Sequence, residues 1–392
     1  MQGKRTLFCI VATVVAMCIL LGFFKGYLAI WSVWRVYTLT PHFGDLRNLT
    51  GGAESIARGY DPLYFNPGDP WDRPMNHPRL VQYIVSLLRM NQSHTTFIGS
   101  LFMALFFLGI FLSLKDIDNK TAFILSIVIL SPAVMLGIER ANHDLFIFFL
   151  ISLALFVIRF PILSMIILLI ASFIKIFPIF ALSYFVKYNR KTCVIVLLSF
   201  ATIFVLYIFL NRADLPQIFN STEKHYGVFA YGTRACFPSL TLFSSWIPAT
   251  AIIVSCLVFH MNNLNRFFKD SGSAYIDYFR AGAGIYIGTF FLGNNWNYRL
   301  MFLIFTIPQL MLGEANRLVS LVTLISIVVS CWSPWFDGLV HNSLLFIIDE
   351  TFNWLLLSSL FYLLVSTMPA YVQKSMMRVA SLAQCFHRTD LN

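Results

Sequence analysis

The sequence predicts an all-α protein that crosses a membrane many times, and three properties of the chain support this fold class. Of its 392 residues, 58% are hydrophobic and 12% are charged, whereas about a quarter of the residues in an ordinary soluble domain are charged. The chain contains 40 Phe, and a soluble fold of this size would need more polar surface to cover them. Apolar runs of roughly 20 residues, long enough to cross the hydrocarbon core as a helix, recur along its length. We therefore expect residues 1–392 to form a single integral membrane domain.

The apolar runs predict about twelve membrane-spanning helices. The expected spans are residues 7–24, 95–114, 121–138, 144–158, 161–174, 176–187, 193–210, 239–260, 280–292, 299–313, 318–335 and 351–368. The first run follows Lys4 and Arg5, as the core of a signal peptide does, but it is too long for such a core and lacks a convincing cleavage site. We expect a retained anchor. An even number of spans puts both termini on one side, and the basic residues near the N-terminus and in the tail, residues 369–392, place that side in the cytoplasm.

The stretch 145–186 can be divided in two ways, because its length suits two comfortable spans or three short ones. Two spans would carry Lys187 and Arg190 to the outer face, whereas three spans return them to the cytoplasm, where basic loops are favoured. Three spans place Lys175 and Pro178 where two short helices meet. Such residues are tolerated at membrane depth only where the backbone is buried in protein or lines a cavity. We therefore expect a broken helix that faces the interior.

The topology leaves two substantial segments outside the membrane. Residues 35–93 are polar and rich in Gly, Pro and Asp, and this first extracytoplasmic loop is too long to be a simple connector, so we expect it to be functional. Residues 211–238 form a shorter second segment. We also expect residues 336–350 to lie along the outer surface, because Asp349 and Glu350 would be costly at the membrane midplane.

The net charge of +10 does not indicate nucleic-acid binding, because the basic residues are scattered between apolar runs rather than gathered in one patch. The 7 Cys form no CxxC pair and lie mostly in apolar runs, where Cys behaves as a small hydrophobic residue. We therefore expect no nucleic-acid partner, no disulfide framework and no cofactor.

Cations are unusually frequent on the side that this topology assigns to the outside, where basic residues are disfavoured. Arg binds phosphate through a planar fork and Lys through a point charge, so several convergent cations would suit the phosphate of a lipid-linked headgroup. Any one of them can instead reach out to anionic lipid headgroups. The residues concerned are Arg140, Lys175, Lys224, Arg234 and Arg299.

Asp45 lies just beyond the end of the first span, directly after Gly44. A carboxylate at this boundary could reach a cavity at the membrane interface. It could act there as general base for an acceptor hydroxyl if partial burial and a neighbouring group tune its pKa. The alternative is structural, because Asp45 could cap a helix or pair with Arg47.

A dense polar knot lies between the spans expected at 121–138 and 144–158. Such density at a membrane boundary indicates a functional site, although a short loop between helices must also be polar somewhere. A metal site is a weaker interpretation, because Glu139, His143 and Asp144 do not assure three ligands at fixed spacing. The knot contains Glu139, Arg140, Asn142, His143 and Asp144.

A second polar group, Asn297-Tyr-Arg, precedes the span expected at 299–313. Its aromatic residue Tyr298 and the neighbouring Trp296 could stack on sugar rings. Aromatic residues are also common at membrane interfaces for reasons unrelated to ligands.

The order of these motifs resembles the GT-C glycosyltransferases, and in particular the polyprenyl-phosphate-mannose-dependent enzymes of glycosyltransferase family 87. The segments that carry the resemblance extend over about the first three quarters of the chain. They are Asp45, Gly51-Gly-Ala-Glu, Arg58-Gly-Tyr-Asp-Pro-Leu-Tyr, Asn76-His-Pro, Glu139-Arg-Ala-Asn-His-Asp, Lys175-Ile-Phe-Pro and Asn297-Tyr-Arg-Leu. The sequence departs from the family at His77, where Tyr is frequent, and at His143, where a small or apolar residue is frequent.

The resemblance implies a GT-C-like helical bundle with an extracytoplasmic active site in which Asp45 is the catalytic base. We expect transfer of a sugar, a hexose such as mannose, from a polyprenyl-phosphate carrier to a hydroxyl of a glycan, lipid or protein acceptor, without a metal ion. The expected location is the cytoplasmic (inner) membrane of a bacterium, in contact with membrane lipids and with the site on the outer face. The expected substrate-binding residues are Arg47, Arg58, His77, Glu139, Arg140, Asn142, His143, Asp144, Lys175, Arg234, Asn297, Tyr298 and Arg299.

Two other functions fit parts of the same pattern. A transporter or flippase for a lipid-linked saccharide would use broken helices such as the one expected near Lys175, but it favours an internal repeat and polar residues near the midplane. The sequence shows no such repeat. A ligase or polymerase of longer lipid-linked glycans would share the fold and need a wider acceptor groove.

Overall fold

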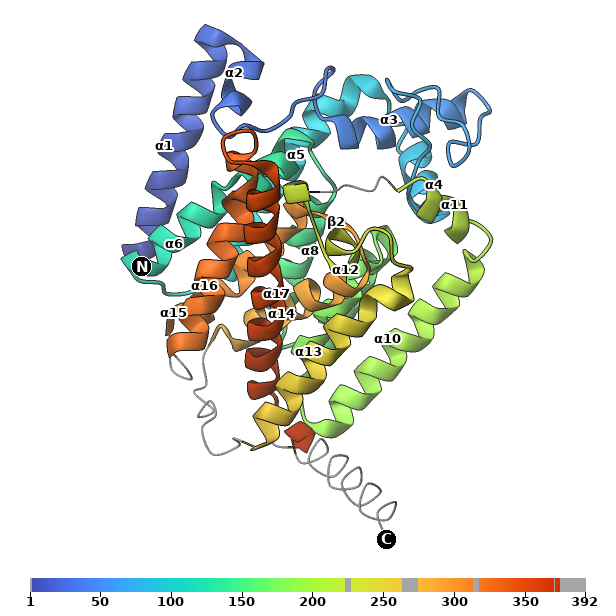
Figure 1. The fold of residues 1–392 in the computed structure, drawn as a ribbon. Helices are drawn as coiled ribbons and strands as arrows, with labels where there is room; N and C mark the ends of the chain where they lie inside the picture. Colours follow the sequence, from blue (N-terminus) through green and yellow to red (C-terminus); the bar gives the residue numbers. More distant parts are fainter. Residues whose placement is uncertain (1, 223–226, 263–273, 313–316, 370, 374–392) are drawn as a thin grey trace.

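In the computed structural model, which describes residues 2–222, 227–262, 274–312, 317–369 and 371–373, the chain is a bundle of helices (Figure 1). The β structure of these residues is limited to one pair of two-residue strands. Six helices in the described residues are long and apolar enough to cross a membrane. These findings confirm the all-α membrane class. The six are α1 (Gln2–Lys25), α5 (Thr95–Ser113, preceded by η1, Gln92–His94), α10 (Arg190–Leu210), α13 (Leu242–Asn262), α16 (Arg317–Trp332, followed by η6, Ser333–Phe336) and α17 (Asn342–Ser366).

A seventh candidate span is broken in the middle. Helices α6 (Asn119–Ile129) and α7 (Pro132–Glu139) are bent by 54° relative to each other. The Ser131 side chain accepts a hydrogen bond from the backbone N–H of Val134, and Pro132 occupies the first turn of α7. Because Pro is well suited to a first turn and lacks the N–H that a continuous helix would need, the sequence itself sets this break.

The remaining apolar stretches form shorter helical elements. These are α8 (Asp144–Phe156), α9 (Pro161–Ile174), η2 (Phe177–Lys187), α14 (Ile276–Phe291), η5 (Asn297–Phe305) and α15 (Ile307–Leu312). None of them has the length of about 20 residues that a perpendicular span needs. The count of about twelve spans therefore stays a prediction.

Residues 144–187 fold as three helical elements rather than two long helices. Lys175 ends α9 in an extended conformation, with φ −144° and ψ 147°, and Pro178 lies at the start of η2. The chain is thus broken at the place where the two residues least compatible with a lipid-exposed helix occur.

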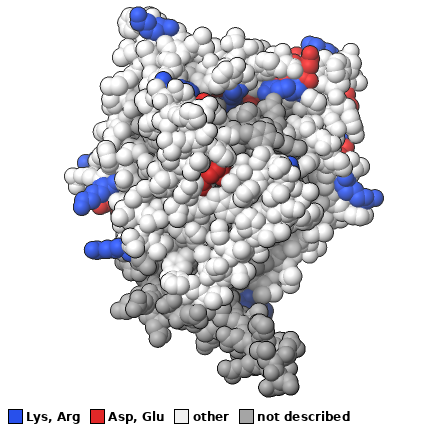
Figure 2. Space-filling view, viewed as in Figure 1, with Lys and Arg blue, Asp and Glu red and all other residues white. Residues whose placement is uncertain are grey.

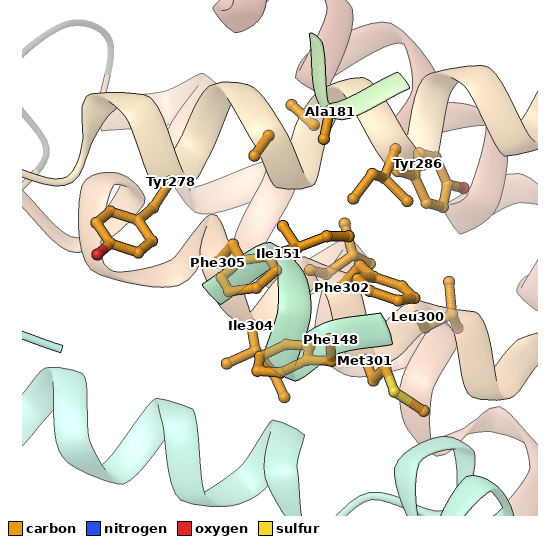
Figure 3. Close-up of a cluster of buried hydrophobic side chains, with 14 of the residues drawn as sticks. Phe148, Ile151, Ala181, Tyr278, Tyr286, Leu300, Met301, Phe302, Ile304 and Phe305 are labelled. Atoms are coloured by element: carbon orange, nitrogen blue, oxygen red, sulfur yellow. The ribbon is translucent and has the colours of Figure 1, made fainter. Parts of the chain in front are cut away.

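The centre of the bundle is an aromatic core between α8, η2, α14 and η5 (Figure 3). Phe148 of α8 stacks on Phe305 of η5 with ring centroids 4.3 Å apart. Helix α14 approaches η2 closely because Gly288 lacks a side chain: a Cβ there would lie 2.0 Å from the Phe180 ring. Small residues at helix contacts are typical of packing in lipid. This rigid core supports both the start of α8 and the start of η5.

The outside of the bundle is suited to lipid. Only 11% of the apolar window of α1 and 17% of that of α10 are buried within the protein, so most of their side chains face outward. Figure 2 shows charged residues along the upper edge and the flanks of one face, whose middle is almost uncharged. A largely uncharged surface below a charged edge is expected of a protein that faces lipid.

The first outer segment is folded rather than extended. After α2 (Tyr27–Ser32) the chain forms α3 (Gly44–Ala57) and α4 (Arg79–Leu87). A small core that includes Phe43, Leu46 and Met75 packs these helices against Ile98 of α5. The segment therefore presents Asp45 on a structured element above the bundle, at the top of Figure 1.

The second outer segment contains α11 (Leu215–Asn220), η3 (Gly227–Phe229), β1 (Ala230–Tyr231) and α12 (Thr233–Cys236). Strand β1 pairs antiparallel with β2 (Asn295–Trp296), with Ala230 opposite Trp296 and Tyr231 opposite Asn295. This short pairing ties the second outer segment to the start of η5.

One expectation about the outer surface is corrected. Residues 342–350 belong to α17, a continuous helix of 25 residues, instead of lying along the surface before the last span. Asp349 and Glu350 are both buried within it. Neighbouring side chains, rather than water, surround these carboxyl groups. Of the expected cytoplasmic tail, 369–392, residues 370 and 374–392 lie outside the described residues.

Candidate functional site

A network of buried charges lies where α8, η2 and η5 begin, and Asp144 is at its centre. The Asp144 side chain is fully buried and receives two cations: Lys175 Nζ lies 2.6 Å from Oδ1 and Arg299 Nε lies 3.4 Å from Oδ2. The Arg299 contact is longer than the 2.7–2.9 Å typical of a charge-assisted hydrogen bond. Of the two cations, Arg299 is therefore the one less firmly held by Asp144.

Asn142 connects this network to Asp45. Its Nδ2 donates to Asp45 Oδ2 at 2.5 Å, while its Oδ1 accepts from Lys175 Nζ at 3.2 Å and from the backbone N–H of Asp144 at 2.9 Å. A single amide thus fixes both the catalytic candidate and the ion pair. The preceding residue, Ala141, is buried and adopts a left-handed conformation with φ 46°, which is unfavourable for Ala and is held here by the surrounding packing.

Asp45 lies in the first turn of α3. Its backbone N–H and that of Leu46 both point to the Arg140 carbonyl, at 3.3 and 3.4 Å. The carboxylate benefits from the positive end of the helix, but Asp45 does not cap it, because the N-cap is Phe43 and no side chain makes a capping hydrogen bond there. The expected pair with Arg47 is not formed either, because the Arg47 side chain binds the His42 carbonyl and Gln92 instead of Asp45. Asp45 is half-buried, and Oδ1 accepts no hydrogen bond among the described residues.

The Asn297-Tyr-Arg motif reaches the same place from η5. Tyr298 is buried, and its phenol lies within electrostatic reach of Asp45, Asp144 and Arg299 and near the Asn142 amide. Asn297 donates from Nδ2 to the Val228 carbonyl at 3.2 Å, while its Oδ1 is buried without a hydrogen-bond partner in the described part of the chain. Thus Tyr298 and Arg299 join the network, and Asn297 binds the second outer segment.

Glu139 and Arg140 form a separate pair beside the network. Glu139 is fully buried, with Oε2 3.2 Å from Arg140 Nε, and its Oε1 accepts from the backbone N–H of Leu39 at 3.3 Å. The Arg140 guanidinium also donates to the Tyr37 carbonyl at 3.2 Å. These contacts hold the chain that leads from α2 to α3. The pair therefore helps to position Asp45, because it holds the backbone that precedes α3.

His77 and His143 face each other beside the network, with ring centroids 4.4 Å apart. Both rings are buried, and both nitrogens of His77 and Nε2 of His143 have no hydrogen-bond partner among the described residues. Burial lowers the pKa of His77 well below its usual value, and the charges of His143 and Lys175 act in the same direction. Burial and then Lys175 lower the pKa of His143 in the same way. Both rings are therefore neutral at pH 7.

Three of the expected substrate-binding cations lie away from the network. The Arg47 side chain is bound within the outer segment, as described above. The Arg58 side chain is 57% exposed and pairs with Glu54 one helical turn earlier. The Arg234 side chain packs against Gly293, and its Nε is buried without a partner in the described residues.

Two residues near the site were not among the predicted substrate-binding residues. Arg73 donates to the Gly44 carbonyl at 2.5 Å while Asp69 binds its guanidinium at 2.9 Å, so it supports the start of α3. Asn295 accepts a short hydrogen bond from Arg299. The only signal for Asn295 was its position four residues before Arg299, and the turn-rich stretch around Arg73 gave no signal for a contact so distant in sequence.

The site combines the half-exposed Asp45 carboxylate, the fixed Asn142 amide and a network of buried charges. The charges balance, because the negative charges of Asp45 and Asp144 offset the positive charges of Lys175 and Arg299. Such an arrangement can accept a proton at Asp45 Oδ1 and can offer Arg299 to an anion that displaces its long contact with Asp144. No group of three or more His, Cys, Asp or Glu side chains suited to a metal ion lies within the described residues. No protein-family model and no curated protein matches the chain.

Proposed function

We propose that the protein is a membrane glycosyltransferase of the GT-C type, with a bundle of about twelve spans, that acts at the outer face of a bacterial cytoplasmic membrane. It moves a hexose, such as mannose, from a polyprenyl-phosphate carrier to a hydroxyl of a glycan, lipid or protein acceptor. The observation that carries the proposal is the Asn142 amide, which joins the half-exposed Asp45 to the Asp144, Lys175 and Arg299 network.

In the proposed reaction, Asp45 Oδ1 takes the proton of the acceptor hydroxyl while the acceptor oxygen forms a bond to the anomeric carbon of the sugar. The bond between that carbon and the phosphate oxygen breaks, and its electron pair leaves with the polyprenyl phosphate. Arg299 and Lys175 stabilise the charge that develops on the phosphate. Asn142 holds Asp45 in place, so proton transfer occurs from a fixed geometry.

The neutral histidine pair has a distinct role in this proposal. His77 and His143 contribute uncharged nitrogens at the edge of the site, where they can hydrogen-bond hydroxyls of a sugar without adding charge. Buried polar groups that gain partners only when a ligand binds favour ligands that supply those partners.

The test is a transfer assay in membranes with radiolabelled polyprenyl-phosphate sugars. A general base contributes about 10²–10⁴-fold to a rate, so the Asp45→Asn variant, expressed at the wild-type level, is expected to lose at least about a hundredfold in transfer. Asp72→Asn is the matched control, because Asp72 is an exposed carboxylate of the same outer segment. Undiminished transfer by Asp45→Asn would remove Asp45 as the base.

A flippase is the second candidate, because the break at Lys175 and the bent α6–α7 pair are features of transport sites. The same membranes distinguish the two functions. A flippase moves the labelled lipid across the bilayer without cleaving it, whereas a transferase releases polyprenyl phosphate only when an acceptor is present.

A further inference from the structure

A groove of about 550 Å³ lies between α12, α13 and α17, separate from the charged network around Asp144. Its walls are largely apolar, and Lys and Arg do not occur among its lining residues. They are Cys236, Ile252, Phe346, Ile347, Glu350, Thr351, Trp354, Leu355 and Ser358. Neighbouring side chains of both long helices, such as Val254 and Leu344, are exposed, so the groove opens toward the surface that faces lipid.

Glu350 is the unusual residue of this groove. Only 4% of the residue is exposed, and its two carboxylate oxygens are buried and accept no hydrogen bond among the described residues. The Trp354 indole N–H, one turn along α17, is near enough to influence the carboxylate as a donor, but it lies beyond hydrogen-bond distance.

The adjacent carboxylate, Asp349, provides a contrast within the same helix. Asp349 Oδ1 accepts a short hydrogen bond from Ser333, and Oδ2 accepts one from Asn353 at 3.1 Å. Asn353 is in turn bound by the Tyr286 hydroxyl at 2.9 Å. Asp349 is therefore satisfied by the protein and has a structural role, whereas Glu350 is left without a partner on the groove side.

A buried carboxylate that pairs with no cation and accepts no hydrogen bond is costly, and the cost is removed when a ligand brings the missing charge and donors. The apolar walls require that this ligand carry a hydrocarbon chain, and the carboxylate requires a cationic donor. An ammonium group supplies one positive charge and three donors on a compact centre. We propose that the groove binds a single-chain membrane amphiphile with a primary amino headgroup, whose ammonium pairs with Glu350.

This proposal does not depend on the proposed transferase activity, because it involves neither Asp45 nor any residue of the network around Asp144. The ligand is held by two independent features: the chain contacts Ile252, Phe346 and Leu355, and the ammonium contacts Glu350. Loss of the carboxylate should therefore abolish the preference for an amine while leaving weak binding of the chain.

The test uses the full-length protein in phosphatidylcholine nanodiscs and two photoreactive probes of equal chain length, a diazirine-bearing long-chain amine and the corresponding alcohol. In the wild-type protein the amine is expected to label peptides of α13 and α17 at least about tenfold more than the alcohol, which is the discrimination expected of one charge pair. In Glu350→Gln, amine labelling should fall to the level of the alcohol. The exposed carboxylate variant Asp72→Asn should keep the wild-type preference.

Two results would overturn the proposal. Equal labelling of the wild-type protein by amine and alcohol would show that the groove does not select a cation, and full amine labelling of Glu350→Gln would show that the carboxylate is not the partner. If Glu350→Gln does not fold, competition in the wild-type protein decides the matter. Unlabelled long-chain amine should then displace the probe at concentrations at least about tenfold lower than the alcohol.

Discussion

At the scale of the single residue, the direction of a side chain decided which sequence predictions the structure supports. Asp45 and Arg47 are two positions apart on α3, and residues at this spacing do not face the same side of a helix. Arg47 therefore cannot point where Asp45 points. The polar knot after α7 was easier to predict, because five polar residues between apolar runs must be accommodated somewhere. Its fixed arrangement depends on the left-handed Ala141, which the sequence does not signal.

The neutral histidine pair gives a pH dependence of stability. The folded pKa values of His77 and His143 lie below the usual value of 6.5, so the unfolded chain binds protons that the folded protein does not. The stability that the neutral pair contributes is complete above about pH 6.5 and is lost as the pH falls through the folded values. We expect a loss of up to about 1.4 kcal/mol per pH unit for each histidine in this window.

Thermal unfolding in detergent between pH 7.5 and pH 5 measures this effect. The apparent unfolding temperature of the wild-type protein should fall on acidification. His77→Phe, which keeps an aromatic ring in the pair, should show a smaller fall, and the exposed control His94→Phe should match the wild type. An identical pH profile for His77→Phe and the wild type would contradict the assignment.

At the scale of the element, Arg79 provides the ion pairs that join the two outer segments, beside a hydrogen bond from Gln217 to the Leu63 carbonyl. Arg79, at the start of α4, binds Asp61 of the first segment at 2.6 Å and Asp214 before α11 at 3.1 Å. The hydrogen bond from Arg79 lowers the pKa of Asp61. Both segments were predicted to lie outside the membrane, and the first was predicted to be functional, but ion pairs between residues far apart in sequence depend on the folded topology and leave no local pattern.

Removal of this contact should loosen the first segment. In Arg79→Gln we expect faster cleavage by chymotrypsin after the exposed Tyr60 and Tyr64, because opening of the segment no longer breaks two ion pairs. Partly exposed pairs contribute little each, so the expected acceleration is modest, about two- to fivefold. Arg89→Gln is the control, since Arg89 is exposed in the same segment. Equal cleavage rates for both variants would show that the contact does not hold the segment closed.

At the scale of the whole molecule, composition was sufficient to predict a helical membrane protein. It was not sufficient to predict the number of spans. Apolar runs have the same composition whether they face lipid or lie in the aromatic core around Phe148 and Phe305. Helices α8, α9 and η2 are of this kind: they are apolar enough for lipid but shorter than a perpendicular span. Hydropathy alone cannot distinguish a short crossing from a buried helix.

The predicted topology can be tested with single cysteines in a background from which all 7 native Cys have been replaced. Asp72→Cys lies on the expected outer side and Asn189→Cys on the expected inner side, and both positions are exposed. A membrane-impermeant maleimide should label position 72 in intact spheroplasts and position 189 only after permeabilisation. Labelling of position 189 from outside would require a different number of crossings before α10.

The hydrogen bond between Asn142 and Asp45 joins residues 97 positions apart, and the contact between Asp144 and Arg299 spans 155 positions. Ribosomes insert such a chain from its N-terminus, so Asp45 and Asn142 are in the membrane long before Arg299 has been synthesised. Until then Lys175 is the only one of the two cations available to Asp144. The site is therefore completed late in biogenesis, when the segment after β2 docks between helices that are already in place.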